Sequence, residues 1–540
     1  MRNSFLKFAA GVAALSMWAG APFAAQALAS WSTAVNVSSS GFLLSNPEIA
    51  IDADGVMTAI WSHVGVSTKT VQVSTSSDGQ VWTSPVNVSP ISHEAIQPHL
   101  VVDGTGRVTV IWMNEAGDYE VIWSSKRESG ATTWSEPVQL SGTNQDTSQA
   151  QLVVDSAGVV TTIFNNRTVG EIQSRTSNNG AAWTNVVTLD SSTSSYLGQP
   201  QIAVDGSGRV TAVWRAYDSD SDGGKVVSRS SVNPGVWSSA TTLFGGDAND
   251  ARIAATESGL TTVTAISDFS EVEIQSRSSQ DGGTWTTAVG HGTGDGDAPN
   301  VSVVGSDTVV ITWYSPADEG LFAISSQDGV QWTTKHLVDD GGSAWLGVSV
   351  DHVAQVIADS SGQLTAVWMR DYTTDYDYPR FRATSSTSTD GITWSEPVEL
   401  AGTSSYSANL VVNSDCRVTT LFELSDGTEN TVQSRTLDNG GCPAVAITSA
   451  PRSLRVGPKT ATSRKLVWKT PASLNGNVIT DYVIQFRVGG TSVWSTFTDG
   501  ISTRRKVKVT GLTKGVKYQF QVAARTAGGD SPYSVATGAR

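Results

Sequence analysis

Short apolar runs separated by turn residues recur along most of this chain. After Trp82 they read PHLVVD, RVTVIW, YEVIWSS and TTWSEPVQL, with Gly, Asp and Ser between them. Runs of this length bounded by such residues indicate β-strands. The first two runs are almost continuously apolar, which is typical of strands buried on both faces. The pattern therefore predicts four-stranded units that pack between neighbouring units.

The unit repeats along the chain with a leading tryptophan. That residue recurs as Trp31, Trp82, Trp134, Trp183, Trp237, Trp285, Trp332 and Trp394, at spacings of 51, 52, 49, 54, 48, 47 and 62 residues. Four short strands per repeat of this length predict an all-β fold, a β-propeller. Counting first strands gives eight blades, and seven is the alternative if the degenerate fifth repeat, ARIAATESGLTTVTAIS, is irregular.

The two ends of the repeat region complement each other. Residues 31–38, WSTAVNVS, have the pattern of a fourth strand without the first three, whereas residues 407–440 supply three strands without a fourth. We expect the N-terminal strand to complete the last sheet and close the ring. The propeller would then span residues 30–445.

The first 29 residues have the pattern of a secretory signal peptide. Arg2 and Lys7 supply positive charge, residues 8–21 are apolar, and the small residues at 27–29 suit cleavage. No later apolar stretch approaches the roughly 20 residues that span a bilayer, and no C-terminal anchor signal is seen. We expect an exported protein without a transmembrane segment, extracellular or associated with the cell surface.

Four turns between third and fourth strands share a motif. They read SSDGQVW, SQDGGTW, SQDGVQW and STDGITW, ending at Trp82, Trp285, Trp332 and Trp394, and SNNGAAW is a weaker copy. These turns resemble the Asp boxes of sialidase-like β-propellers, although they are one residue shorter. In the families that carry them, Asp boxes lie away from the active centre, so the resemblance implies the fold rather than the chemistry.

The pattern changes beyond Pro443. Residues 449–540 contain APRSL, LVWKTP, DYVIQFRV and VTGLTKGVKYQFQVAA, and over their whole length they resemble a fibronectin type III domain. The resemblance makes Trp468 the inner-sheet tryptophan and Tyr518 the corner tyrosine of that β-sandwich.

Charge is divided unequally between the two predicted domains. Of 35 Lys plus Arg and 50 Asp plus Glu, residues 449–540 hold 15 and 3, and residues 1–29 hold 2 and none, which leaves 18 and 47 for the propeller. A basic module on an acidic one predicts intramolecular docking or attraction to an anionic envelope polymer. The alternative is a solubilising surface without a partner. We expect no nucleic-acid partner, and the oligomeric state is open.

The two cysteines fall in neighbouring turns of the predicted last blade. Cys416 lies in the hairpin between its first and second strands, and Cys442 lies just beyond its third strand. Alternating hairpins put both turns on one rim, and export permits oxidation. We therefore predict a Cys416–Cys442 disulfide.

One position of each first strand is polar in all eight repeats and is followed by Ile, Leu or Val. The eight residues are Glu48, His99, Gln151, Gln201, Arg252, Asn300, Gln355 and Asn409. Their place predicts a polar ring at the mouth of the central channel, with Glu48, His99 and Arg252 as candidate ligand contacts. The alternative is that the channel holds only water, which also requires polar walls.

The seventh repeat is the longest and carries two loops on the same face as the ring. Residues 339–352 and 370–380 supply the candidate ligand-binding residues Trp345, Arg370, Asp371, Tyr372, Asp375, Tyr376 and Tyr378. Aromatic rings beside hydrogen-bonding groups suit sugars, and long loops on a rigid scaffold commonly carry function. The alternative is that these aromatic side chains pack on one another.

A loop of the fourth repeat resembles the start of a Ca²⁺-binding loop. Asp218, Asp220 and Asp222 alternate and precede Gly223. The twelfth position holds Arg229 instead of the closing carboxylate. Ca²⁺ is thus the one cofactor that the sequence suggests, and a solvated acidic loop is the alternative.

The resemblance to sialidases implies an arginine cluster, a Tyr/Glu pair and an acidic residue. Arg215, Arg252 and Arg370 form a partial arginine set, with Tyr314 and Glu423 at equivalent strand ends. However, the chain has no Arg-Ile-Pro motif, no Ser-His-Asp signature, no phosphate loop and no zinc spacing. We therefore expect a non-catalytic protein that binds extracellular glycans or envelope surfaces. The alternatives are a sialidase-like glycoside hydrolase and a protein-interaction scaffold.

Overall fold

The computed structural model describes two β-rich regions, one before and one after residue 448. It describes residues 30–41, 43–65, 68–90, 94–116, 119–180, 182–192, 195–218, 223–267, 273–293, 297–318, 320–340, 354–371, 381–438, 449–472, 479–491, 494–497, 500, 502–526 and 529–537. Within these ranges every regular element is a strand. The segment predicted as a signal peptide and Cys442 lie outside them.

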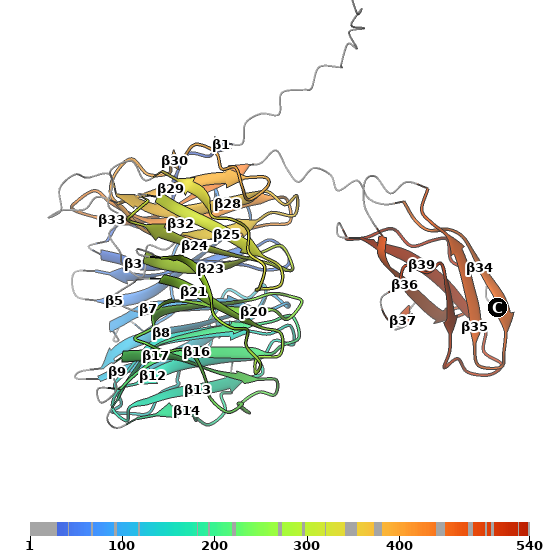
Figure 1. Cartoon of the computed structure of the whole chain (residues 1–540), viewed down its shortest axis with the longest axis horizontal. Helices are drawn as coiled ribbons and strands as arrows, with labels where there is room; N and C mark the ends of the chain where they lie inside the picture. The colour runs from blue at the N-terminus through green and yellow to red at the C-terminus, as the bar shows by residue number, and fades with distance from the viewer. Residues whose placement is uncertain are drawn as a thin grey trace, which may run out of the picture.

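The first region forms eight antiparallel sheets, each a blade of a propeller (Figure 1). Blade 1 has β3 (Leu43–Ile51), β4 (Met57–Val64), β5 (Lys69–Ser76) and β6 (Val86–Asn87); blade 2 has β7 (Glu94–Val102), β8 (Val108–Ala116), β9 (Tyr119–Arg127) and β10 (Val138–Gln139). Blade 3 has β11 (Thr147–Val154), β12 (Val160–Asn166), β13 (Glu171–Ser177) and β14 (Val187–Ser191); blade 4 has β15 (Ser195–Val204), β16 (Val210–Asp218), β17 (Gly223–Ser231) and β18 (Thr241–Phe244).

The remaining blades follow the same order of strands. Blade 5 has β19 (Asn249–Ala255), β20 (Thr261–Ser267), β21 (Glu273–Ser279) and β22 (Val289–Thr293); blade 6 has β23 (Asp297–Val304), β24 (Thr308–Ser315), β25 (Gly320–Ser326) and β26 (His336–Asp339). Blade 7 has β27 (Gln355–Ala358), β28 (Leu364–Asp371), β29 (Phe381–Ser388) and β30 (Val398–Glu399); blade 8 has β31 (Ser405–Val412), β32 (Arg417–Ser425) and β33 (Asn430–Asp438), with β1 (Ser30–Trp31) and β2 (Val35–Asn36).

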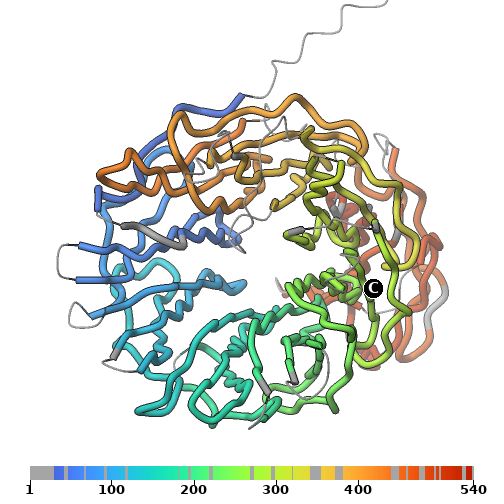
Figure 2. Tube along the Cα trace, turned by 60° about the vertical axis from the view of Figure 1, so that its left-hand side comes forward, coloured from blue at the N-terminus to red at the C-terminus, as the bar shows by residue number. Residues whose placement is uncertain are grey.

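The blades follow one another around a ring (Figure 2). The first strand of every blade contacts the first strand of the next, from β3 through β7, β11, β15, β19, β23 and β27 to β31, which contacts β3 again. The eight-bladed prediction is confirmed, and the seven-bladed alternative is wrong. The degenerate fifth repeat keeps all four strands, although it has Ala265 where most blades have a buried aromatic residue.

Strands from both ends of the propeller close the ring. Both β1 and β2 pair antiparallel with β33, so that Trp31 lies opposite Leu437 and Val35 opposite Ser434. The indole Nε1 of Trp31 donates to Ser385 Oγ in blade 7 at 2.7 Å. Val37 is only 2% exposed and joins the apolar cluster between blades 8 and 1. The predicted closure by the N-terminal strand is therefore confirmed.

The core lies between blades because the second strand of every blade except blade 5 carries a large buried aromatic side chain. These are Trp61, Trp112, Phe164, Trp214, Trp313, Trp368 and Phe422. The cluster around Trp112, for example, joins Ile60 and Val73 of blade 1 to Leu100 of blade 2. This arrangement explains why the first two strands of each repeat are almost continuously apolar.

The four Ser-x-Asp-Gly turns share one set of internal hydrogen bonds, from backbone N–H groups to the Ser hydroxyl and the Asp carboxylate. In the first, Gly79 N donates to Ser76 Oγ at 2.9 Å, and Val81 N donates to Asp78 Oδ1 at 2.8 Å. Backbone N–H donors, that of Val81 foremost, lower the pKa of Asp78. The indole of Trp82 donates to Ser434 Oγ of blade 8 at 2.9 Å. The motif is thus a folding device.

The second region is a two-sheet β-sandwich. One sheet is β34 (Arg452–Lys459), β35 (Arg464–Lys469) and β38 (Lys506–Val509); the other is β37 (Ser495–Phe497), β36 (Ile479–Val488), β39 (Tyr518–Thr526) and β40 (Gly529–Asp530). Trp468 and Tyr482 meet edge to face between the sheets, with ring centroids 5.1 Å apart. Tyr518 Oη accepts from Thr513 N at 3.2 Å, as a corner tyrosine does. Among the described residues, no helix has the length and hydropathy to span a membrane.

Removing the closing strands should unfold the propeller. A chain that begins at Gly41 loses the pairing of β1 and β2 and leaves the edge of β33 open. We expect a much lower melting temperature or aggregation than for the chain that begins at Ser30, measured by circular dichroism and light scattering. Val37→Ala should cause an intermediate loss, and melting of the shortened chain at the parental temperature would contradict the role of closure.

Candidate functional site

The first strand of most blades has a bulge just before the ring position. In β7, for example, the register shifts between Ile96 and His99. Equivalent shifts occur in β3, β11, β15, β19, β23 and β31. Six residues at the bulge have positive φ without being glycine, namely Gln97, Gln149, Gln199, Asp250, Ala298 and Ser407. Each stands two positions before a ring residue.

The residue between the bulge and the ring position is always small or lacks an N–H group. These residues are Pro47, Pro98, Ala150, Pro200, Ala251, Pro299, Ala354 and Ala408. Proline cannot donate to a neighbouring strand, so within sheets it is confined to edges and bulges. A Pro or Ala just before the ring position of the first strand, the inner edge strand of each blade, was the sequence signal for this feature, and the repeat pattern alone missed it.

The bulge places two polar positions in succession along the channel. Ring residues such as His99 and Gln151 are half-buried, and the bulge residues Gln97 and Gln149 are exposed. The residues between and after them, such as Pro98, are buried. We call the six positive-φ residues the bulge tier and the eight predicted polar residues the ring tier.

Neighbouring blades exchange hydrogen bonds within the ring tier. His99 Nδ1 lies 2.5 Å from Glu48 Oε1, and Leu100 N donates to Glu48 Oε2 at 3.3 Å. On the other side of blade 1, Asn409 Nδ2 donates to the carbonyl of Pro47 at 2.6 Å and Asn409 Oδ1 accepts from Gln355 Nε2 at 3.1 Å. The predicted ring therefore links blades 7, 8, 1 and 2.

The bulge tier also makes a contact between blades. Gln199 N of blade 4 donates to Gln149 Oε1 of blade 3 at 2.9 Å. The Oε1 atom of Gln199 itself is buried and has no hydrogen-bond partner among the described residues. Arg252 of blade 5 donates from Nη1 to the carbonyl of Ala251 at 3.2 Å. The two tiers of blades 2 to 4 hold five glutamines, namely Gln97, Gln149, Gln151, Gln199 and Gln201.

The residues predicted for a sialidase-like site lie in different blades. Arg215 of blade 4 pairs with Asp247 at 3.1 Å, and Arg370 of blade 7 pairs with Asp339 at 3.3 Å. Tyr314 of blade 6 is 8% exposed. Blades 4 and 8 stand on opposite sides of an eight-bladed ring, so Arg215 is remote from Glu423. The catalytic assignment of these residues remains a prediction.

Glu423 has the most perturbed carboxyl group of blade 8. It is 5% exposed, and its Oε1 accepts from Asn430 Nδ2 at 2.6 Å. Burial raises the pKa of Glu423 to about 7, and the hydrogen bond from Asn430 opposes that rise. A carboxyl that retains its proton near neutrality can donate it, which is what a general acid requires.

Several predicted site residues fall outside the described part of the structure. They are Trp345, Tyr372, Asp375, Tyr376 and Tyr378 of the seventh repeat and Asp220 and Asp222 of the fourth. Asp218 ends β16 and Asp371 ends β28, and their side chains are likewise not described. Among the residues that are described, no three His, Cys, Asp or Glu side chains gather as a metal site. The glycan loops and the Ca²⁺ loop remain predictions.

The stability of the propeller should depend on pH through Glu423. Because its folded pKa is raised, the folded state holds this proton more tightly than the unfolded chain, and stability is lost as pH rises from 4.5 through about 7. We expect Glu423→Gln to be more stable than the parent by on the order of 3 kcal/mol at pH 8 and equal to it near pH 4. Urea denaturation across this range measures the difference. Glu429→Gln, at an exposed position of the same blade, is the control, and parallel curves for Glu423→Gln and the parent would contradict the assignment.

Comparisons with known proteins found one family model and several solved structures similar to parts of this chain. The family model described as "Fibronectin type III domain" matches residues 449–539. Among solved structures, "Titin kinase and its flanking domains" is 26% identical at TM-score 0.17 and covers 17% of this chain, which spans 17% of that structure. An α-L-arabinofuranosidase from Fusarium graminearum is 14% identical at TM-score 0.36, covering 52% of this chain and 92% of its own. An α-L-arabinanase from Penicillium chrysogenum is 13% identical at TM-score 0.35, covering 53% and 94%. On the match to the family model, residues 449–539 form a fibronectin type III domain.

Proposed function

We propose that the propeller binds extracellular glycans at its channel mouth without chemical conversion. The observation that carries this proposal is the pair of polar tiers on the first strands. In blades 2 to 4 they present Gln97, Gln149, Gln151, Gln199 and Gln201, each with neutral donors and acceptors. Neutral amides match the hydroxyl groups of sugars and neither release nor take up protons at ordinary pH. A wall of this kind favours recognition over catalysis.

The backbone strain of the bulge tier supports a role for its side chains. A non-glycine residue with positive φ costs about 1 kcal/mol or more, a cost that glycine avoids. The chain uses glycine freely at positive φ elsewhere, as in the turns at Gly79 and Gly329. At Gln149 (φ 53°) and Gln199 (φ 51°) it instead carries long amide side chains. Strain retained in this way is typical of binding positions.

Glycine substitutions in the bulge tier separate binding from folding. Gln149→Gly and Gln199→Gly remove the amides while relieving backbone strain, so stability should not fall by more than about 1 kcal/mol. With the glycan that the parent binds best on an array, each variant should lose roughly 1 kcal/mol of affinity, about fivefold in Kd by calorimetry. Ala298→Gly, at the same geometry in blade 6, is the matched control. Unchanged affinity in the Gln149→Gly, Gln199→Gly double variant would refute the channel site.

Glycoside hydrolysis is the second candidate, and the raised pKa of Glu423 is the observation that favours it. A protonated carboxyl could serve as the acid of a two-carboxylate mechanism. If so, the parent should release fluorophore from at least one member of a fluorogenic glycoside panel, and Glu423→Gln should abolish that release. A parent inactive on the whole panel would remove this candidate.

The remaining features of this proposal come from the sequence. We infer that residues 1–29 direct export, that Cys416 and Cys442 form a disulfide, and that the Ser-x-Asp-Gly turns are shortened Asp boxes of a sialidase-like propeller. Cys416 is buried in its turn with φ 61°, where its equivalents in other blades are glycines such as Gly106. The stabilisation from a disulfide at that turn would compensate for the backbone strain of Cys416 at positive φ, a strain that glycine avoids.

A further inference from the structure

One face of the fibronectin type III domain is strongly basic. In β35, Leu466 and Trp468 are buried in the core, and the alternate residues Lys465, Val467 and Lys469 are exposed. Successive side chains of a strand point to opposite faces, so these three residues share the outer face of the sheet. No carboxylate occurs in β34, β35 or β38.

Basic residues on both neighbouring strands extend this face. Lys465 lies directly opposite Lys508, and Val467 lies between Arg455 on one side and Lys506 on the other. Residues opposite each other across an antiparallel pair have Cβ atoms about 5 Å apart, and like charges at that distance destabilise the pair. The sheet therefore holds a repulsion that a bound anion would relieve.

The compensating negative charge is missing from the domain. Its acidic residues are Asp481, Asp499 and Asp530, none of them on this sheet. Among the described residues, Lys465, Lys506 and Lys508 form no ion pair with a carboxylate. The described part of the domain therefore offers these three lysines no carboxylate partner.

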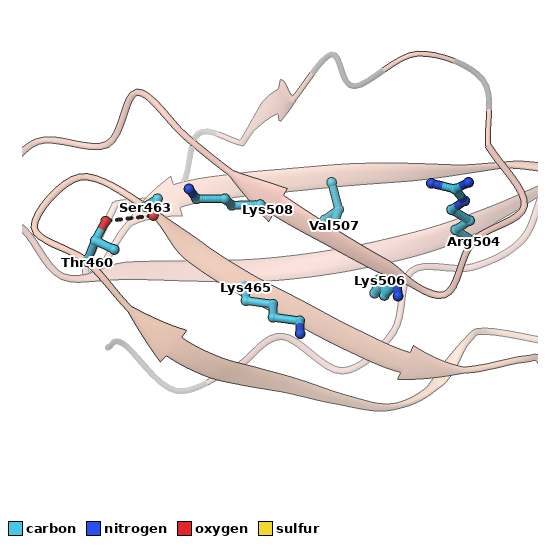
Figure 3. A pocket seen from close by; sticks show the side chains of 7 residues that line it. All are labelled: Thr460, Ser463, Lys465, Arg504, Lys506, Val507 and Lys508. Carbon is cyan, nitrogen blue, oxygen red and sulfur yellow. Dashed lines mark hydrogen bonds between the residues drawn. The ribbon is translucent and has the colours of Figure 1, made fainter.

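A hollow of about 470 Å³ runs beside the edge strand β38 (Figure 3). Its lining includes Thr460, Ser463, Lys465, Arg504, Lys506 and Lys508. The hydroxyls of Thr460 and Ser463 lie 2.7 Å apart at one end. Lys506 and Lys508 are on β38, Arg504 precedes this strand, and Lys465 is on the neighbouring β35. Cations and hydroxyls together are suited to oxyanions, because both donate hydrogen bonds to them.

We propose that this basic face binds an extended polymer carrying phosphate groups. Lys506 and Lys508 are two residues apart on one strand, so their Cα atoms are separated by about 7 Å, and Arg504 continues the row. A row of charges along a strand fits repeated anionic groups better than a single ion. Lysine ammonium groups bind phosphate as point charges, without the planar geometry that arginine imposes. The site is separate from the channel and does not depend on its function.

Two other uses of the face are less well supported. The acidic propeller offers carboxylates, but many of them are already engaged in their own turns, as Asp52 is with Val56 N at 2.8 Å and Asp103 with Thr105 N at 2.8 Å. Lysines on an edge strand also guard against strand pairing between molecules. That role does not require cations on the central strand β35, where Lys465 and Lys469 stand.

The test measures binding of long-chain inorganic polyphosphate to the whole protein, with neutral dextran as the negative probe. Lys506→Glu with Lys508→Glu should weaken polyphosphate binding roughly tenfold or more, and the parental affinity should fall steeply with salt. Lys514→Glu with Lys517→Glu is the control, because it makes the same charge change at exposed positions on the segment before β39. The control should bind within about twofold of the parent.

Three outcomes would overturn the proposal. Equal losses in both double variants would mean that only net charge matters. A second outcome is that the parent fails to bind polyphosphate at low salt while the Lys506→Glu, Lys508→Glu protein is more expanded than the parent in small-angle scattering. That result would show that the basic face docks on the propeller instead. If the Lys506→Glu, Lys508→Glu protein binds polyphosphate as the parent does but self-associates, the two lysines serve to prevent strand pairing between molecules. Thermal melting verifies that each variant is folded, and Lys506→Gln with Lys508→Gln should give a smaller loss in the same direction.

Discussion

Every blade of this propeller buries its apolar faces against its neighbours, so no blade has a core of its own. Ile60 of blade 1 packs with Trp112 of blade 2, and Leu421 of blade 8 packs with Trp61 of blade 1. An open ring would therefore leave two half-cores exposed to water. Closure by β1 and β2 is a condition for the whole domain because it supplies the last missing strand and the buried Val37.

The same packing determines the chemistry of the turns. A Cβ atom on Gly79 would lie 2.5 Å from Thr436 Oγ1 of blade 8, and one on Gly329 would lie 2.1 Å from Ser278 Oγ of blade 5. The glycines of these turns are thus required by the adjacent blade as well as by their positive φ. The bulge tier instead carries side chains at positive φ, with glutamine at three of its six positions.

Much of the fold could be predicted from the sequence, because the repeat of about 50 residues and the alternation of apolar runs with turn residues follow from which side chains are buried. The incomplete first and last repeats predicted the closure, and Trp468 and Tyr518 predicted the sandwich. The candidate site was harder to foresee. Sequence reasoning identified the ring tier, whereas the bulge tier depends on local backbone geometry that is indicated in the sequence only by the Pro or Ala between the two tiers. The partner of Arg215, Asp247, follows the fourth strand of blade 4, and the partner of Arg370, Asp339, ends the fourth strand of blade 6, and no periodicity reveals either pairing.

The closing pair joins the two ends of the propeller in sequence as well as in space. Thr436 N donates to Ser32 Oγ, 404 positions away in the sequence, so the first strand of the propeller can pair only after its last strand has been made. Contacts of such separation form late in folding, because the whole intervening chain has to be ordered first. During that interval β33 is an open edge, which is the kind of surface that attracts strands of other molecules. The rate of ring completion, rather than the strength of any blade, therefore sets how long each new molecule is exposed to aggregation.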